Sequence, residues 1–205
     1  MDAEAWDERY AASELVWSAG PNRFVERECA GLPPGDALDL AAGEGRNAIW
    51  LSRRGWRATA VDFSRVALDK GRTLAEDTPV EWVVGDATTW HRPEGFDLVV
   101  VAYLQLRPAQ RQAAMRNALV SLRPGGTMLV VAHDSSNISE GTGGPQDPSV
   151  LYTAEDVVAD LEGAAPGELV VERAERVTRP VEPGHGGEAT LTAYDCLVRV
   201  RRTPG

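Results

Sequence analysis

The chain has 205 residues and a formal net charge of −10, with 43% hydrophobic and 25% charged residues. This length suits one domain with a sizeable core and is too short for two full domains plus a linker. The charge disfavours DNA, RNA or an anionic membrane as a partner. The sequence shows neither an apolar run of membrane-spanning length nor a secretory signal behind its acidic N-terminus, so we expect a cytoplasmic protein with no membrane partner.

The head of the chain, residues 1–35, is predicted to be a helical cap separate from the unit formed by residues 36–205. A short helix is expected near residues 3–10. A second is expected to open at Gly20-Pro21-Asn22, with Pro21 in its first turn.

From residue 36 onward, short apolar runs alternate with helical patterns. Such alternation predicts parallel strands joined by right-handed crossovers. The expected strands are 37–40, 59–62, 81–84, 96–102 and 127–132, and the expected helices are 47–54, 64–76 and 108–122.

The pattern changes after the fifth strand. Residues 134–152 are rich in Gly, Ser, Asn and Pro and are expected to form a long irregular loop. Thr153-Ala154-Glu155-Asp156 resembles a capping box that opens a helix to about residue 161. The stretches 168–178 and 189–201 are expected to pair as antiparallel strands at the sheet edge.

The segment after the first strand, from Asp39 to Ala48, is built mainly of small residues. Such residues let the backbone turn sharply and approach a ligand closely. Gly43, Gly45 and Ala48 also match G-x-G-x-x-A, the dinucleotide fingerprint, with Asp62 at a suitable distance for a ribose contact. A tight strand-to-helix turn without any ligand gives the same pattern.

Carboxylates around this loop separate the ligand classes. A pyrophosphate favours a helix N-terminus, but Asp39 and Glu44 would oppose it. They suit a phosphate-free ligand with cationic groups, such as S-adenosylmethionine (SAM), which carries an ammonium and a sulfonium. Asp62 ends the second strand and can accept hydrogen bonds from two ribose hydroxyls, while Asp86 ends the third and can accept from an adenine amino group. Parallel strands bring these carboxylates to one edge of the sheet.

Five motifs in this order resemble those of class I SAM-dependent methyltransferases and cover roughly residues 36–133. Ala41 replaces the first glycine of the family pattern. The resemblance implies a Rossmann-like three-layer sandwich with a mostly parallel seven-stranded sheet and an antiparallel C-terminal hairpin. It also implies SAM as cofactor and S-adenosylhomocysteine (SAH) as product. The motifs are Asp39-x-Ala41-x-Gly43-x-Gly45, Val61-Asp62, Gly85-Asp86-Ala87, Phe96-Asp97-Leu98-Val99 and Leu122-Arg123-Pro124-Gly125-Gly126.

The same resemblance assigns cofactor contacts residue by residue. The head, Trp6-Asp7-Glu8-Arg9-Tyr10, is similar to small bacterial methyltransferases of the tellurite-resistance and thiopurine types, in which this segment covers the cofactor. For the head residues and for Phe63, ordinary packing is the alternative. The implied contacts are Asp39, Ala41, Ala42, Gly43 and Gly45 with the methionine part, Asp62 with the ribose, Phe63, Asp86 and Ala87 with the adenine, Ala102 and Tyr103 with the sulfonium end, Arg9 with the carboxylate, and Trp17 as a lid residue.

The segment after the fourth strand, Ala102-Tyr103-Leu104-Gln105, bears on the acceptor. It lacks the Asn/Asp-Pro-Pro-Tyr/Phe motif of enzymes that methylate amines of bases and the Pro-Cys nucleophile of cytosine-C5 enzymes. We therefore expect a small-molecule acceptor, no nucleic acid and no metal. His133 and Tyr103 are the catalytic candidates, residues 134–152 are expected to be a lid, and the candidates for acceptor binding are Trp6, Tyr10, Gln105, His133, Asp134 and Tyr152.

Two other functions fit parts of this pattern. One is a reductase that binds NAD(P) through the same glycine loop, although the acidic loop and Pro124-Gly125-Gly126 disfavour it. The other is a non-catalytic SAM-binding module. The sequence also leaves open whether sulfur, oxygen, nitrogen or another chalcogen accepts the methyl group.

Overall fold

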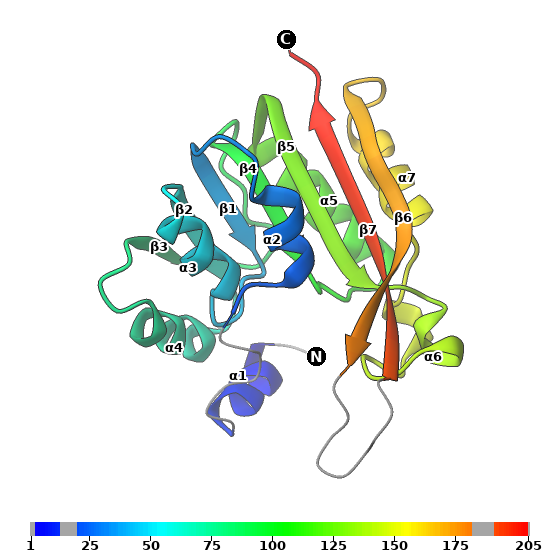
Figure 1. Cartoon of the computed structure of the whole chain (residues 1–205), viewed down its shortest axis with the longest axis horizontal. Helices are drawn as coiled ribbons and strands as arrows, with labels where there is room; N and C mark the ends of the chain where they lie inside the picture. Colours follow the sequence, from blue (N-terminus) through cyan, green and yellow to red (C-terminus); the bar gives the residue numbers. More distant parts are fainter. Residues whose placement is uncertain (1–2, 13–19, 182–190, 205) are drawn as a thin grey trace.

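The computed structural model describes residues 3–12, 20–181 and 191–204. Within them the strands form one seven-stranded sheet in the order β3-β2-β1-β4-β5-β7-β6 (Figure 1). The first five strands are parallel, and β7 runs antiparallel between β5 and β6. The predicted α/β fold with an antiparallel C-terminal hairpin is confirmed. The strands are β1 (Asp36–Leu40), β2 (Arg57–Asp62), β3 (Val80–Val84), β4 (Phe96–Ala102), β5 (Leu122–His133), β6 (Leu169–Val181) and β7 (Leu191–Arg202).

Helices cover both faces of this sheet, which gives three layers. Side chains of α2 and α3 pack on one face, and those of α5 and α7 pack on the other (Figure 1). The helices are α1 (Ala3–Ala11), α2 (Arg23–Cys29), α3 (Arg46–Arg53), α4 (Arg65–Ala75), α5 (Pro108–Ser121), α6 (Asn137–Glu140) and α7 (Ala154–Ala164), with a 3₁₀ turn η1 (Pro148–Val150).

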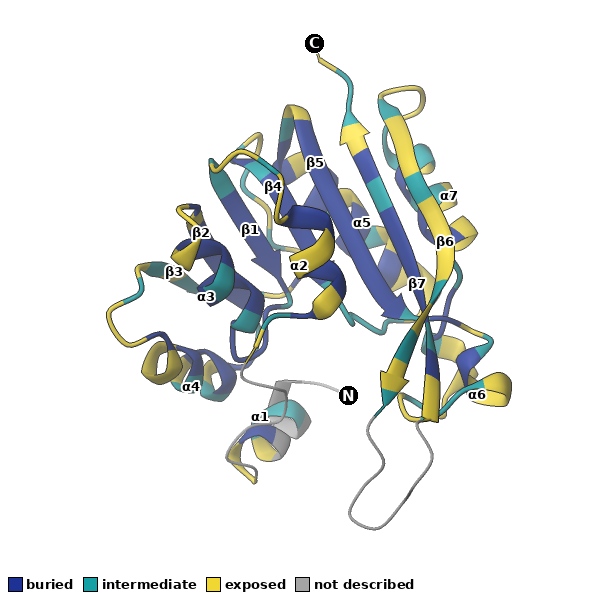
Figure 2. Cartoon of the chain, in the orientation of Figure 1, coloured by how far each residue is buried: buried dark blue, intermediate teal, exposed yellow. Residues whose placement is uncertain are grey.

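The central strand β4 shows why the sheet is buried on both sides. Leu98 and Val100 belong to the core under α2 and α3, whereas Val99 and Val101 belong to the core under α5 and α7. Alternate side chains of a strand point to opposite faces, so a continuous apolar run suits a strand with helices on both sides. Figure 2 shows the buried residues concentrated in these middle strands.

The structure corrects two predictions about local elements. Pro21 does not lie in the first helical turn, because α2 begins at Arg23 and the side chain of Asn22 caps it by accepting from the amides of Phe24 and Val25. A capping side chain satisfies amides that the helix leaves unpaired. Residues 134–152 are also not irregular throughout, since they contain α6 and η1. The capping box of Thr153 and Asp156 is present, as predicted.

The parallel strands end at one edge of the sheet, and α1 and α6 lie at that edge (Figure 1). α1 is fastened to α4 there. The Ser64 hydroxyl, which caps α4, donates to the Asp7 carboxylate, and the Lys70 ammonium donates to the carbonyl of Tyr10. In the part of the chain that the structure describes, no helix has the length and apolarity to cross a membrane.

Candidate functional site

The glycine loop joins β1 to α3 in a run of left-handed backbone conformations. Ala41, Gly43 and Gly45 have φ values of 62°, 56° and 73°. At Gly45 a Cβ atom would meet the Trp82 ring at 2.5 Å, so this position requires glycine for conformation and for space. Ala41 adopts the strained conformation although it has a Cβ atom. The backbone turn expected from the sequence therefore forms at Ala41 without its glycine.

Asp39 lies under this loop, one residue before the end of β1. It is 1% exposed, and its Oδ2 accepts from the amide of Ala48 at 3.1 Å. Its Oδ1 has no hydrogen-bond partner among the described residues. Burial raises the pKa of Asp39 to about 7. The loop thus contains a buried carboxylate oxygen that a cationic or hydrogen-bonding ligand group would satisfy.

Asp62, the last residue of β2, holds the loop in place. Its Oδ2 accepts from the amide of Gly43 at 2.8 Å, and its Oδ1 accepts from the amide of Ser64 at 2.9 Å. Burial raises its pKa, although these two hydrogen bonds oppose that change. Each oxygen retains a second lone pair that could bind a ribose hydroxyl.

The structure brings the third expected carboxylate to the same edge. Asp86 follows β3 and is exposed, and its Oδ1 accepts from the amide and the hydroxyl of Thr88 at 2.8 Å. Ala87 beside it is buried, while Phe63 after β2 is half-buried. These positions follow the ends of the neighbouring parallel strands β2 and β3.

The head residues are only partly described. The ring centroids of Trp6 and Tyr10 lie 5.5 Å apart, and Tyr10 is 4% exposed. The side chain of Arg9 and all of Trp17 lie outside the described residues, so their expected roles stay predictions.

A pocket of about 290 Å³ opens at the same edge, between α2 and α3 on one side and the ends of β5 and β6 on the other. Two predicted residues, Tyr103 and His133, line it, and their rings are in contact at a tilt of 41° with centroids 4.8 Å apart. Tyr103 has a φ of 59°, a left-handed conformation that is rare for a bulky side chain. The described lining residues are Pro21, Asn22, Arg23, Arg46, Tyr103, His133, Arg179 and Pro180.

Asp195 on β7 lies behind this pocket and connects its side chains. It is fully buried, and its Oδ2 accepts from the Tyr103 hydroxyl at 2.8 Å and from Nε of Arg179 at 2.9 Å. Its Oδ1 lies 3.2 Å from Nδ1 of His133, within ion-pair distance, although neither atom makes a hydrogen bond of good geometry within the described part of the chain. Although burial alone would raise the pKa of Asp195, its contacts with His133, Arg179 and Tyr103 hold it below the usual value.

Tyr103 is a neutral group at this site. Burial raises the pKa of its phenol, and the adjacent Asp195 carboxylate raises it further. Its hydroxyl donates a hydrogen bond to Asp195. Tyr103 therefore lines the pocket with its ring and holds its hydroxyl as a donor to the buried carboxylate.

Three other candidates are absent from the described lining of the pocket. Gln105 accepts from the amide of His133 at 2.8 Å and donates to the carbonyl of Val150 at 2.7 Å. Asp134 is buried and accepts from the amide and the hydroxyl of Ser136. Tyr152 is 1% exposed and donates to the carbonyl of Leu104. Through these hydrogen bonds the three side chains stabilise the segment after β5.

Sequence reasoning missed Asp195 and the arginines of the pocket. Asp195 faces His133 because antiparallel β5 and β7 pair these two residues in register, and a sequence pattern does not show that register. Arg46 directly follows the glycine loop, which was an available signal. No three His, Cys, Asp or Glu side chains gather as metal ligands would among the residues described.

Comparison with known proteins finds relatives among methyltransferases. Residues 37–126 match a methyltransferase-domain family. The chain is 35% identical over 129 residues to the demethylmenaquinone methyltransferase of Mycobacterium bovis, a match that covers 60% of this chain and 53% of that protein. The chain thus spans about half the length of the curated relatives it matches.

Two solved structures share its fold at low sequence identity. The N-methyltransferase NodS of Bradyrhizobium japonicum, solved with SAH, is 20% identical with a TM-score of 0.72, and the match covers 98% of this chain and 99% of that one. TehB of Haemophilus influenzae is 15% identical with a TM-score of 0.71, covering 98% and 66%. Residues 37–126 therefore resemble a methyltransferase domain, and the chain shares the Rossmann-like fold of these two structures.

Proposed function

We propose that this protein is a SAM-dependent methyltransferase that acts on a small-molecule acceptor. The observation that carries the proposal is the end of β1, where the buried Oδ1 of Asp39 lacks a partner within the described residues, beside the glycine loop. A buried carboxylate oxygen calls for a donor or a cation, and the ammonium of SAM is both. A pyrophosphate would meet repulsion from the same carboxylate, which weighs against NAD(P).

The other residues at the edge fit the remaining parts of SAM. Asp62 has lone pairs for the ribose hydroxyls while it holds Gly43. Asp86 and Ala87, which follow β3, are the residues that would hold the adenine. Glu44 is buried and its carboxylate lies 3.7 Å from the ammonium of Lys70, so the loop adds an ion pair.

His133 is the acceptor-side base in this proposal, and Asp195 positions it. A neutral imidazole that carries its proton on Nδ1, the nitrogen 3.2 Å from Oδ1 of Asp195, keeps Nε2 as a proton acceptor for the pocket that His133 lines. Bound SAM would supply the methyl group and would retain the electron pair of the broken carbon–sulfur bond on its sulfur. The acceptor atom bonds to the methyl carbon, and a hydroxyl or amine acceptor passes its proton to Nε2. The main contribution of the protein is to hold the two reactants in line.

Pocket size and charge favour a small molecule over a nucleic acid. A pocket of about 290 Å³ is at the small end of ligand sites. The chain has a net charge of −10 and lacks the base-methylation motif after β4. The match to the methyltransferase-domain family ends at residue 126, before His133, Arg179 and Asp195. The acceptor of the demethylmenaquinone methyltransferases is therefore not carried over to this chain.

Calorimetric titration tests the cofactor assignment. We expect SAH to bind and NADH not to bind, and we expect Asp39→Asn to weaken SAH binding by about tenfold through loss of a charge-assisted contact. Asp36→Asn, at the opposite end of the same strand, is the control and should leave SAH affinity unchanged. Binding of NADH without SAH would refute the proposal.

A further inference from the structure

Lys70, in the middle of α4, contacts both the head helix α1 and the glycine loop. Its ammonium donates to the carbonyl of Tyr10 in the last turn of α1 and lies 3.7 Å from a carboxylate oxygen of Glu44 in the loop. An ammonium has three donors, so it can hold both groups together. We propose that Lys70 is a positioning residue for the cofactor, which links the docking of α1 to the glycine loop. This inference rests on the proposed methyltransferase function.

On the loop side, α4 packs too closely to move independently. The Glu44 side chain is 3% exposed, and a buried carboxylate is costly without a nearby cation, so it holds the ammonium of Lys70 in place. A Cβ atom at Gly71, the next residue of α4, would lie 2.8 Å from the carbonyl oxygen of Glu44 and 2.5 Å from the Trp82 ring. The same ring fills the space beside Gly45. A shift of α4 at Lys70 would therefore displace the loop.

On the other side, α1 depends on its contacts with α4. It has nine residues, and an isolated helix of this length is only marginally stable in water. The last carbonyls of a helix have no partner within it, and a cation beside them complements the helix dipole. Lys70 provides such a cation at the carbonyl of Tyr10. Loss of this contact should therefore loosen α1.

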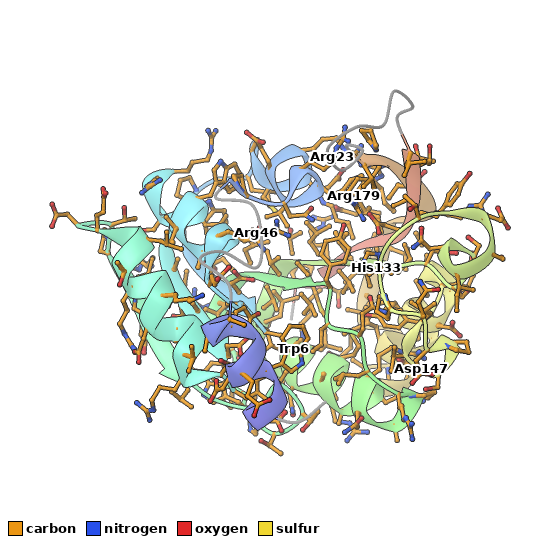
Figure 3. The ribbon with its side chains drawn as sticks, turned by 90° about the horizontal axis from the view of Figure 1, so that it is seen from below. Trp6, Arg23, Arg46, His133, Asp147 and Arg179 are labelled. Atoms are coloured by element: carbon orange, nitrogen blue, oxygen red, sulfur yellow. The ribbon has the colours of Figure 1, made fainter. Side chains whose placement is uncertain are left out.

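A second contact joins α1 to the end of β2. The Ser64 hydroxyl donates to the Asp7 carboxylate of α1, and the Ser64 amide donates to Asp62, the proposed ribose ligand. Burial raises the pKa of Asp62, two backbone hydrogen bonds oppose that change, and the negative charge of Asp7 adds to it, as expected for two nearby carboxylates. Figure 3 looks onto this edge of the sheet and shows Trp6 of α1 across the site from Arg46. Thus α1 is anchored beside both the loop and the proposed ribose ligand.

Hydrogen exchange of the α1 amides and calorimetry with SAH test the link together. If docked α1 favours SAH, bound SAH favours docked α1 by the same factor, so SAH should slow exchange in residues 3–12. We expect Lys70→Met to speed this exchange in the free protein and to weaken SAH binding by about fivefold or more. Lys70→Arg, which keeps the charge, should recover most of both. Arg72→Met is the matched control on the same helix, because Arg72 pairs with the exposed Asp69, and it should change neither.

Asp7→Ala separates the docking of α1 from the pairing of Glu44. It removes the contact with Ser64 and leaves Lys70 beside Glu44. Loss of the negative charge of Asp7 alone would favour ionised Asp62, so weaker SAH binding in this variant would report the loosened helix. We expect faster exchange of α1 together with weaker binding. Unchanged SAH affinity in both Asp7→Ala and Lys70→Met overturns the inference, as does equal exchange of α1 with and without SAH in the unmodified protein.

Lys70 is the only lysine of the chain, which allows a test without substitution. Its side chain is 24% exposed, so an amine-specific acetylating reagent can reach it, and mass spectrometry distinguishes it from the α-amine. Saturating SAH should slow its acetylation by about fivefold or more, and an equal rate overturns the inference. If SAH does not bind the unmodified protein, the proposed function fails and the coupling with it. The exchange of α1 in free Lys70→Met then still shows whether Lys70 docks the helix.

Discussion

Nδ1 of His133 lies 3.2 Å from Oδ1 of Asp195, and the two residues are register partners on antiparallel strands β5 and β7. This pairing fixes the side of the imidazole that faces the core and leaves the other ring nitrogen for the pocket. The buried carboxylate also accepts hydrogen bonds from Tyr103 and Arg179, so Asp195 orients three side chains of the proposed acceptor site.

Removal of the charge of Asp195 should therefore reduce catalysis more than cofactor binding. In Asp195→Asn the amide can donate to Nδ1 of His133 and so place the imidazole proton on Nε2, which could then no longer accept one. We expect the turnover number for a hydroxyl or amine acceptor to fall by about 10²-fold or more. SAH affinity by calorimetry should stay within about twofold, because Asp195 lies away from the glycine loop.

The comparison variant for Asp195 is Tyr103→Phe, which removes one hydrogen bond to the same carboxylate and leaves the His133 contact in place. It should retain most of the turnover. If Asp195→Asn turns over as fast as the unmodified protein, Asp195 does not position the base.

Binding of SAH should depend on pH through Asp39. Its pKa is raised to about 7 by burial, and the ammonium of SAH favours the ionised form. Binding below that pKa then expels a proton, so affinity should fall about tenfold from pH 8 to pH 6. Calorimetry in buffers of different ionisation enthalpy measures the released proton. Asp39→Asn should bind with little pH dependence, and an equal dependence in this variant would assign the proton to another group.

The same shift affects the stability of the protein without cofactor. Because the folded-state pKa of Asp39 is above the unfolded value, the folded state holds the extra proton between about pH 4 and pH 7. The contribution of Asp39 to the free energy of unfolding is therefore largest at low pH and is lost as pH rises through 7. Denaturant unfolding of the protein and of Asp39→Asn should show this difference across the interval, and parallel curves would contradict it.

Gly144 provides a test of the segment after β5. A Cβ atom at Gly144 would lie 3.0 Å from the His133 ring, whereas nothing lies within 4 Å of one at Gly143. Both glycines have positive φ, at 75° and 70°, so alanine at either position brings a similar backbone cost. We expect Gly144→Ala to lower turnover by displacing His133, with normal SAH affinity, and Gly143→Ala to keep turnover. Equal turnover in the two variants would show that the segment around Gly144 does not influence the site. The expectation that residues 134–152 act as a lid stays a prediction.

Ala41 is a site where the protein tolerates strain. With φ at 62°, its Cβ atom costs about 1–2 kcal/mol relative to glycine in the left-handed region. Glycine adds freedom to the unfolded chain, which offsets part of the gain. Ala41→Gly should raise the free energy of unfolding by up to about 1 kcal/mol and the melting temperature by about 2–4 °C. Thermal unfolding measures both, and a lower melting temperature would show that the Ala41 methyl group makes compensating contacts.

The sequence predicted the fold well. It also predicted that Asp39, Asp62 and Asp86, at or beside the ends of β1, β2 and β3, lie at one edge, because parallel strands share their carboxyl ends. The proposed acceptor side was harder to predict. The sequence singled out His133 by its place after the fifth strand, but Asp195 and Arg179 lie on the C-terminal hairpin, whose register depends on tertiary packing. Tyr152 was expected near the acceptor, yet its ring is buried in the core, since an aromatic residue at a helix start can pack inward.

Transfer of a labelled methyl group from SAM tests the central claim most directly. Protein incubated with SAM and a panel of small molecules that carry thiol, hydroxyl or amine groups is analysed by mass spectrometry for methylated product and for SAH. We expect at least one of these acceptors to gain one methyl group for each SAH formed, and we expect this product to be lost in His133→Phe where the acceptor is a hydroxyl or an amine. SAH that binds while no acceptor of the panel is methylated would contradict the account.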